Sequence, residues 1–286
     1  MVRKKSTNSY DDIKSRIVGV SETIGNVSVL FYGRSGTGKT TLAASFPKPI
    51  LLLDIKEQGN DSIADYSDDE IKVLPVEAPE DIEQVYWLLK SGDHSFKTVV
   101  IDTVTQLQEI YMDDILEQDG KDFATKKDWG TVSGLMKTWI INYRDLTEAG
   151  LDVVFLAQER VHDSDSDEDL TDGQLDPSVG PRLMPSVAAI LNASVKVIGN
   201  TFIREVVKRN LDSIDRKTYF CLRVGPHPYY ITKIRKPKNK ECPDYINDPT
   251  YDKIIDIMKG RYEPNKKKAV KKKATTGTSR RNKSTN

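Results

Sequence analysis

A glycine-rich segment ending in lysine and threonine is the part of this chain whose residue types and spacing most directly imply chemistry. It reads Gly33-Arg-Ser-Gly-Thr-Gly-Lys39-Thr40 and fits G-x-x-x-x-G-K-[ST] at every fixed position. Glycines permit a tight turn whose backbone N–H groups converge on phosphate oxygens, while Lys39 can reach the terminal phosphates and the Thr40 hydroxyl can ligate Mg²⁺. We therefore predict a site for ATP and Mg²⁺. Its expected lining is Gly33, Arg34, Ser35, Gly36, Thr37, Gly38, Lys39, Thr40 and Thr41.

A carboxylate at the end of an apolar run is the second candidate group. The run Val99-Val-Ile-Asp102 predicts a buried strand that ends in an acid. Such a strand beside a phosphate-binding loop commonly supplies a second link to Mg²⁺, so Thr40 and Asp102 are the predicted metal ligands. The next residue is Thr103, whereas AAA+-type ATPases usually place their water-activating Glu there. The carboxylate that activates water is therefore expected elsewhere.

The elements that must position these groups alternate between strands and helices, which predicts an α/β domain with a mainly parallel sheet. The chain after residue 158 is expected to be loop-like over 161–186 and then to form short strands. Two of these, 219–224 and 229–234, are predicted to pair as a hairpin around Gly225–Pro228. The expected strands are 27–32, 50–54, 71–76, 98–102, 151–157 and 193–198, and the expected helices are 40–46, one opening at Pro79, 104–118, 129–148 and 249–258.

Charge divides the chain into an acidic body and a basic end. Residues 266–286 hold nine Lys or Arg and no acid, which leaves 34 basic and 43 acidic residues in the rest. We predict a polar leader over 1–25, one ATPase domain over 26–262 and a disordered basic tail over 263–286. Three histidines scattered along the chain argue against a zinc site. With no apolar run of about 20 residues and no secretory signal, the expected location is the cytoplasm.

Together, the motifs resemble those of RecA-like P-loop ATPases. The segment Val99-Val-Ile-Asp102-Thr is similar to the second ATP motif of that family, in which Asp is followed by Ser or Thr. The resemblance places the catalytic carboxylate just after the strand that follows the P-loop helix. Here this position offers Glu57, with Asp54 as second choice, although the two acids stand one residue further apart than the usual Asp-x-Glu. The alternative is that both are solvated acids at a strand end.

Further residues receive roles from the same resemblance. Gln158, at the end of a predicted strand, would sense the γ-phosphate, unless it is an ordinary strand-end residue. The loop after it binds DNA in recombinases, but here it begins with the acidic run 163–169, which repels phosphate. The later segment Gly180-Pro-Arg182-Leu-Met is therefore the better candidate for DNA contact. Lys233 and Arg235 resemble the Lys-x-Arg element that reaches a neighbouring subunit's γ-phosphate, although any basic strand end could imitate it.

The arrangement over residues 27–238 looks most like the small phage RecA-like ATPases that assist single-strand annealing, the Sak-four group. The resemblance implies a DNA-stimulated, homo-oligomeric ATPase that acts on single-stranded DNA in phage recombination, alongside a single-strand binding protein. Two alternatives stay open: a nucleotide-gated loader or adaptor with weak ATPase activity, and a small-molecule or nucleotide kinase. The basic tail likewise has three interpretations, namely a solubility tail, a nucleic-acid grip, or an arm that folds onto the acidic run.

Overall fold

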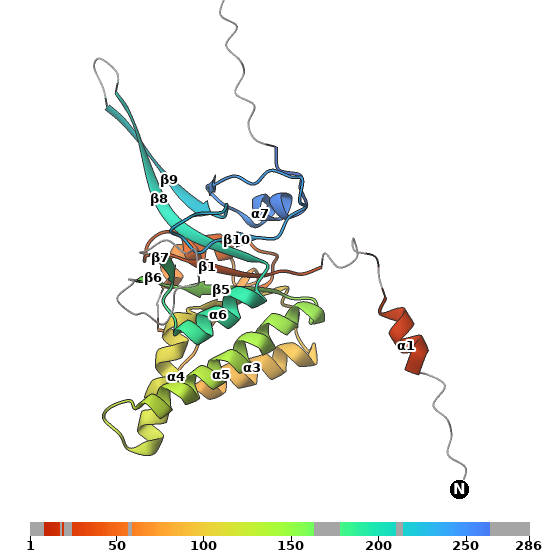
Figure 1. Ribbon diagram of the computed structural model, residues 1–286, viewed down its shortest axis with the longest axis vertical. Coiled ribbons are helices and arrows are strands. Elements are labelled where there is room, and N and C mark those ends of the chain that lie inside the picture. The colour runs from red at the N-terminus through yellow and green to blue at the C-terminus, as the bar shows by residue number, and fades with distance from the viewer. Residues whose placement is uncertain are drawn as a thin grey trace, which may run out of the picture.

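In this computed structural model the described residues are 9–17, 19, 25–56, 59–162, 178–209 and 214–263. Their main feature is a nine-stranded sheet in the order β11-β9-β8-β1-β5-β4-β2-β3, with β10 paired to β8 (Figure 1). The strands of this sheet are β1 (Ser28–Tyr32), β2 (Ile50–Asp54), β3 (Ile71–Pro75), β4 (Thr98–Asp102), β5 (Asp152–Ala157), β8 (Val197–Arg209), β9 (Ile214–Arg223), β10 (Lys233–Ile234) and β11 (Tyr245–Asn247). A separate antiparallel pair joins β6 (Glu159–His162) to β7 (Ser178–Pro181).

The centre of the sheet is parallel and buried on both faces. Strands β1, β2, β4 and β5 are buried at every position, as expected for apolar strands covered by helices on both sides. Strand β5 lies between β1 and β4 and pairs in parallel with each. The ends of these three strands therefore meet at one edge of the sheet. The predicted α/β class, a mainly parallel sheet with further β-structure toward the C-terminus, is confirmed.

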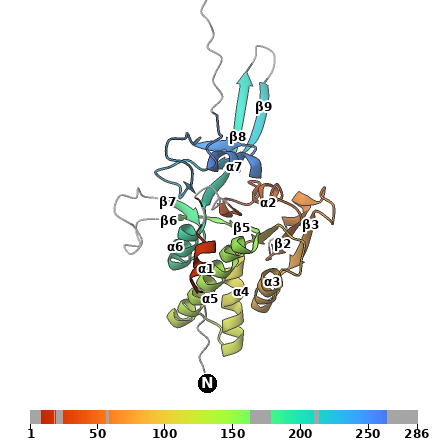
Figure 2. The ribbon, with the colours of Figure 1, turned by 90° about the vertical axis from the view of Figure 1, so that its right-hand side faces the viewer.

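Helices cover the two faces unequally, and each face has its own apolar core. One core joins the sheet to α3 (Pro79–Ser91), α4 (Val104–Asp119), α5 (Lys126–Asp145) and α6 (Pro185–Ser194). The other joins it to α2 (Lys39–Ala43) and α7 (Tyr251–Met258). Figures 1 and 2 show the larger helical layer on one side of the sheet and α7 on the other. Two 3-10 turns, η2 (Gly59–Ile63) and η3 (Leu146–Ala149), complete the described elements, apart from α1.

Local signals fix the ends of the long helices. Pro79 occupies the first turn of α3, where its missing N–H removes no helical hydrogen bond. At the start of α5, Asp128 accepts hydrogen bonds from the Thr125 backbone N–H at 2.8 Å and hydroxyl at 2.7 Å, and Lys121 Nζ lies 3.1 Å from it. The hydrogen bonds from Thr125, followed by the one from Lys121, lower the pKa of Asp128 to about 2. Gly150 ends the following 3-10 turn with φ 92°, a left-handed conformation that glycine adopts readily.

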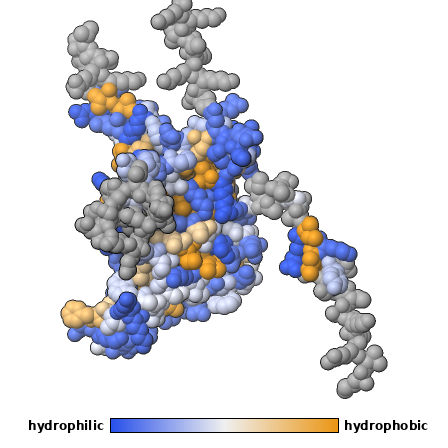
Figure 3. Space-filling model, viewed as in Figure 1, coloured by the Kyte–Doolittle hydropathy of each residue, from blue (hydrophilic) through white to orange (hydrophobic). Residues whose placement is uncertain are grey.

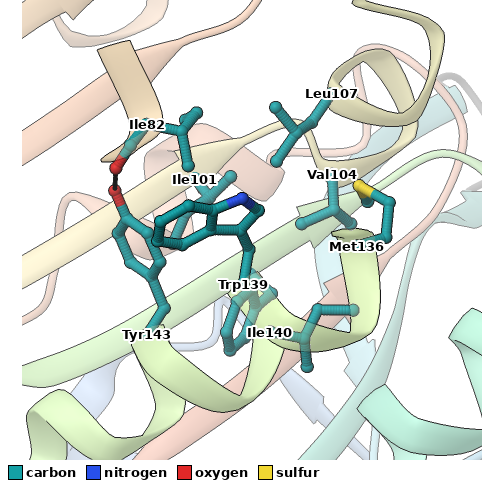
Figure 4. Close-up of a pocket in the computed structure, with 9 residues that line it drawn as sticks. Ile82, Ile101, Val104, Leu107, Met136, Trp139, Ile140 and Tyr143 are labelled. Carbon is teal, nitrogen blue, oxygen red and sulfur yellow. Dashed lines mark hydrogen bonds between the residues drawn. The ribbon is translucent and has the colours of Figure 1, made fainter. Parts of the chain in front are cut away.

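The packing between α3, α4 and α5 is tight. A void of about 10 Å³ lies under these helices, lined by apolar side chains that include Val104, Met136 and Trp139 (Figure 4). The Tyr143 hydroxyl, drawn beside it, donates to the Ile82 carbonyl at 2.8 Å. A void of this size has room for about one water molecule at most and offers it few polar partners, so it belongs to the core and is no ligand site.

A long β-ribbon replaces the hairpin that we predicted near the C-terminal end of the sheet. Strand β9 pairs antiparallel with β8 over ten residue pairs, from Asn200–Arg223 to Arg209–Ile214, so the prediction that 219–224 pairs with 229–234 is wrong. Residues 233–234 instead pair with the start of β8. We call the β8–β9 ribbon beyond Thr201 the arm; it projects away from the helical layer (Figures 1 and 2).

Two further predictions in this region are also corrected. The segment 161–186 contains the end of β6, all of β7 and the start of α6 rather than loop alone. The predicted strand 193–198 begins only at Val197, because helix α6 extends to Ser194. The sequence Pro185-Ser-Val-Ala-Ala-Ile-Leu starts this helix with Pro in its first turn and buries Val187 and Leu191 on one face.

The N-terminal helix α1 (Ser9–Ser15) carries an apolar stripe (Figure 3). Tyr10, Ile13 and Ile17 recur at helical spacing and all are exposed. Within the described ranges, no helix is both long and apolar enough to cross a membrane.

Candidate functional site

The glycine-rich segment forms the connection between β1 and α2 at the edge where the parallel strands end. Gly36 and Gly38 have φ angles of 76° and 85°, which residues with a side chain rarely adopt. Lys39 is 7% exposed, and its Nζ donates to the Gly33 carbonyl at 3.1 Å and to the Arg34 carbonyl at 3.0 Å. The lysine thus folds back over its own loop, which holds the ammonium group beside the backbone that would face a phosphate.

The two predicted metal ligands are in direct contact. The Thr40 hydroxyl donates to Asp102 Oδ2 at 2.7 Å. Asp102 ends β4 and is 4% exposed, and the parallel register places Asp54 of β2 beside it. The peptide bond between Asp102 and Thr103 is cis. The structure therefore brings a hydroxyl, a carboxylate and a second nearby acid to one edge of the sheet.

A cavity of about 490 Å³ opens over this contact, a volume typical of small-ligand sites. Its lining combines the loop and Lys39 with the acid Asp102, so it offers donors for an anion and oxygen atoms for a cation side by side. The residues that line it are Ser35, Gly36, Gly38, Lys39, Thr40, Thr41, Asp61, Ser62, Asp102 and Phe220.

Strand β8 is packed directly against the first turn of the loop. The Thr37 hydroxyl donates to the Arg34 carbonyl at 2.7 Å and lies 2.7 Å from Thr201 Oγ1. A Cβ atom added to Gly33 would lie 2.2 Å from Thr201 Oγ1 and 2.5 Å from its carbonyl oxygen. Gly33 is therefore required by a close backbone approach of the strand that continues into the arm.

A chain of polar contacts runs from the loop to the base of the arm. Arg34 Nε donates to Glu159 Oε1 at 2.8 Å, and Asn200 Nδ2 lies 3.3 Å from the other oxygen of this carboxylate. Arg223 donates to Asn200 Oδ1 at 2.8 Å, and its guanidinium lies 3.8 Å from the centre of the Tyr230 ring. One residue of the predicted phosphate site is thus linked to both strands at the base of the arm.

Gln158 lies at the same edge of the sheet. It follows β5 directly, and Gly33 N donates to the carbonyl of the preceding Ala157 at 3.3 Å. The side-chain oxygen of Gln158 accepts from Arg182 at 3.1 Å, and the other end of that guanidinium lies 3.5 Å from Glu109. Arg182, which lies in the segment predicted to contact DNA, is therefore hydrogen-bonded to the predicted sensor residue.

Lys233 and Arg235 are not among the residues that line the cavity over the P-loop. Lys233 pairs with Ile198 early in β8, and its Nζ donates at 2.7 Å to the Asn192 carbonyl near the end of α6. Burial lowers the pKa of Lys233, and the charge of Arg235 adds to this effect. Arg235 is exposed, and its backbone N–H donates to the Lys196 carbonyl. Their predicted action on a neighbouring subunit stays a prediction.

Some predicted residues fall outside the described ranges. These are Glu57, the acidic run 163–169 and the basic tail from residue 266. Their roles also stay predictions. In the described part of the chain, no group of three or more His, Cys, Asp or Glu side chains is arranged to hold a metal ion. Mg²⁺ commonly takes phosphate and water oxygens as ligands beside one or two protein groups.

Sequence reasoning missed several residues that the fold brings to the loop. Asp61 and Ser62 reach the cavity from η2, and Phe220 reaches it from β9, far away in the chain. Thr201 and Glu159 contact the loop as described above. None of these residues belongs to a local sequence motif. Thr201 and Phe220 could be identified only from the strand pairing, because β8 pairs with β1 and β9 pairs with β8.

A phosphate loop between a buried strand and a helix, with an acid-ended strand nearby in a mainly parallel sheet, defines a P-loop nucleotide-binding protein. Residues 25–235 match the model of a family described as "AAA domain". Since the match covers most of the chain, the protein belongs to this family of P-loop ATPase domains. A search of the curated proteins gives no match.

Solved structures with a similar arrangement include two archaeal proteins. A KaiC-like protein from Pyrococcus horikoshii OT3 is 16% identical, with a TM-score of 0.39 over 69% of this chain and 78% of that one. The flagellar accessory protein FlaH from Methanocaldococcus jannaschii is 12% identical, with a TM-score of 0.36 over 79% and 96%. The cytoplasmic domain of EssC is 18% identical, with a TM-score of 0.28 over 74% of this chain and 38% of that one.

Proposed function

We propose that the protein hydrolyses ATP with Mg²⁺ at the cavity above Lys39. The observation that carries this proposal is the 2.7 Å contact between Thr40 and Asp102 beside the buried Lys39. Hydroxyl and carboxylate oxygens are the hard ligands that Mg²⁺ prefers, so the residues present fit this ion. When bound there, Mg²⁺ would neutralise charge on the phosphate oxygens.

The protein's own groups supply the rest of the site. The loop amides between Gly33 and Lys39 orient the phosphates, and the Lys39 ammonium can exchange its two loop carbonyls for phosphate oxygens. Glu57 is the proposed base that orients the attacking water, with Asp54 as the second choice, and Gln158 the proposed sensor of the terminal phosphate. We extend the proposal to a homo-oligomer, in which Lys233 and Arg235 would act on the neighbour's nucleotide.

We further propose that the ATPase acts on single-stranded DNA, in recombination or strand annealing. One face of the arm supports this extension, because its cations alternate with aromatic rings. Arg204 lies 5.5 Å from the centre of the Tyr245 ring, and Lys217 lies 4.8 Å from that of Tyr219. Arg204 and Tyr219 are directly opposite each other in the β8–β9 register. Proteins that bind single strands commonly combine aromatic rings, which stack on the bases, with cations, which contact the phosphates.

The decisive experiment measures ATP turnover by the purified chain with and without single-stranded DNA. We expect turnover that DNA stimulates, and its loss in Lys39→Ala and Asp102→Asn. Undiminished turnover by Lys39→Ala would refute the site. Nucleotide binding with negligible turnover would favour a loader or adaptor, and phosphate transfer to a small molecule or nucleotide would favour a kinase.

The contribution of the arm is tested by DNA titrations at several salt concentrations. The double substitution Arg204→Ala and Lys217→Ala should make the slope of log K against log salt less steep by about 1.4. This value assumes that each residue makes one phosphate contact, at about 0.7 per contact on single strands. Arg216→Ala is the matched control, since Arg216 lies on the opposite face of the arm, 3.7 Å from Glu205. An unchanged slope in the double variant would exclude this face as the DNA contact.

A further inference from the structure

A second cavity of about 230 Å³ adjoins the phosphate cavity. The two share Gly38, Thr41 and Phe220 as lining residues. Beyond this shared border, the second cavity is bounded by Leu42 of α2 and by the turn Asp248–Thr250. A molecule seated on the loop would therefore pass Thr41 and the Phe220 ring to enter it.

The two cavities differ in chemical character. The first is lined by the P-loop, Lys39 and acids, whereas the second is walled largely by apolar groups, including Leu42, Pro249 and the Phe220 ring. Phe220 is 45% exposed, and a Cβ atom added to Gly38 would lie 3.2 Å from its ring. A large aromatic ring thus borders the phosphate loop with about half of its surface open, and a planar apolar group could stack on it.

The walls of the second cavity are held in place by several bonds. Asp248 N donates to the Phe220 carbonyl at 2.6 Å, and Lys253 Nζ donates to the Asp248 carbonyl at 2.6 Å. The start of α7 is fixed to the end of α2, because Tyr251 N donates to Ser45 Oγ at 2.9 Å. Since both walls are tied to the helix that follows the phosphate loop, the cavity is preorganised relative to the phosphates.

We propose that this second cavity binds the base of the nucleotide, with the ring of Phe220 stacked on it and the turn Asp248–Thr250 closing its far side. This inference rests on the proposed function, since it needs a nucleotide whose phosphates occupy the loop. In space, the polar loop is followed by the shared border and then by the aromatic-lined cavity. This order matches that of the phosphates, the sugar and the base in such a ligand.

The test compares two probes, ATP and inorganic tripolyphosphate, in calorimetric titrations with Mg²⁺. Phe220→Ala should weaken ATP binding on the order of tenfold, the usual scale for losing one base–aromatic stack, and should leave tripolyphosphate binding unchanged. Phe220→Tyr should restore ATP binding. The matched control is Ile203→Ala, since Ile203 lies directly opposite Phe220 on the same face of the ribbon and is similarly exposed.

The outcomes separate this proposal from the ATPase itself. Equal ATP affinity in Phe220→Ala and the unmodified chain, or an equal loss for both probes, would refute the base site while leaving the phosphate site standing. An unmodified chain that binds tripolyphosphate as tightly as ATP would refute it as well. An unmodified chain that binds neither probe would overturn the proposed ATPase and the base site with it.

Discussion

Replacing Gly33 by alanine tests whether β8 and the phosphate loop are as closely packed as the structure shows. The added Cβ would lie 2.2 Å from Thr201 Oγ1 and 2.5 Å from the Thr201 carbonyl oxygen, whereas real contacts of this kind stay above 3.0 Å. Rotation of the Thr201 side chain can remove the first clash, but not the second. The loop and the strand must therefore separate by several tenths of an ångström.

The expected cost of Gly33→Ala is about 1–3 kcal/mol of unfolding free energy, the range for overpacked interiors. For a domain of this size, 2 kcal/mol corresponds to a shift of roughly 4–8 °C in the melting temperature. The displaced Gly33 carbonyl is also a partner of Lys39 Nζ, so binding of a fluorescent ATP analogue should weaken in the same variant.

A helical glycine provides the control for this experiment. Gly134 lies inside α5 with no atom within 4 Å of an added Cβ, so Gly134→Ala should raise stability by about 0.5–1 kcal/mol. Thermal unfolding without nucleotide, together with the binding titration, measures both effects. If Gly33→Ala unfolds at the same temperature and binds the analogue as well as the original chain, then the close approach of β8 to the loop is wrong.

Three other predictions concern catalysis, assembly and acid stability. Glu57→Gln should bind ATP but hydrolyse it at least about 10²-fold more slowly in a turnover assay, which is the usual effect of losing a general base. If Asp54→Asn shows this loss and Glu57→Gln does not, then Asp54 is the base. Arg235→Ala should bind ATP without hydrolysing it, because the arginine would serve the neighbouring subunit. Mixing this variant with Lys39→Ala should therefore restore part of the turnover. A protein that sedimentation shows to be monomeric in the presence of ATP and DNA would contradict this prediction. Because the folded pKa of Asp128 lies near 2, below its unfolded value, its carboxylate stabilises the fold above about pH 4 and loses this effect as the pH falls toward 2. The unfolding free energy of Asp128→Asn should therefore depend less on pH between about 4 and 2 than that of the original chain. Identical pH profiles for the two would show that the pKa of Asp128 is not lowered in the fold.

The parts of the site that sequence could predict are those carried by local patterns. The loop from Gly33 to Thr40 carries its glycines, lysine and threonine in one local motif, and Asp102 ends an apolar run that forms a buried strand between two other buried strands. Both line the same cavity. The pairing of the arm was not predictable in this way. Beyond Thr201, residues on both faces of β8 are exposed, including the neighbours Arg204 and Glu205, so no alternation of buried and polar positions indicates a strand.

Residues that reach the site through tertiary structure were also beyond sequence reasoning. Phe220 borders the loop because β9 pairs with β8, and β8 pairs with β1. The turn Gly225–Pro228 has the composition of a hairpin loop, yet it does not join paired strands, because the long β8 is already the partner of β9. Local turn propensity was overridden by the stronger pairing.

The continuity of β8 gives the arm a mechanical property. The strand touches the phosphate loop at Thr201 and runs on to Arg209, which is eight residues or about 26 Å at roughly 3.3 Å per residue. A tilt of about 5° around Thr201 would carry the far end of this strand sideways by about 2 Å, on that same length. Such a movement is comparable with the difference between a formed and a broken hydrogen bond. A tilt of β8 at its contact with the phosphate loop would therefore be magnified along this one continuous strand.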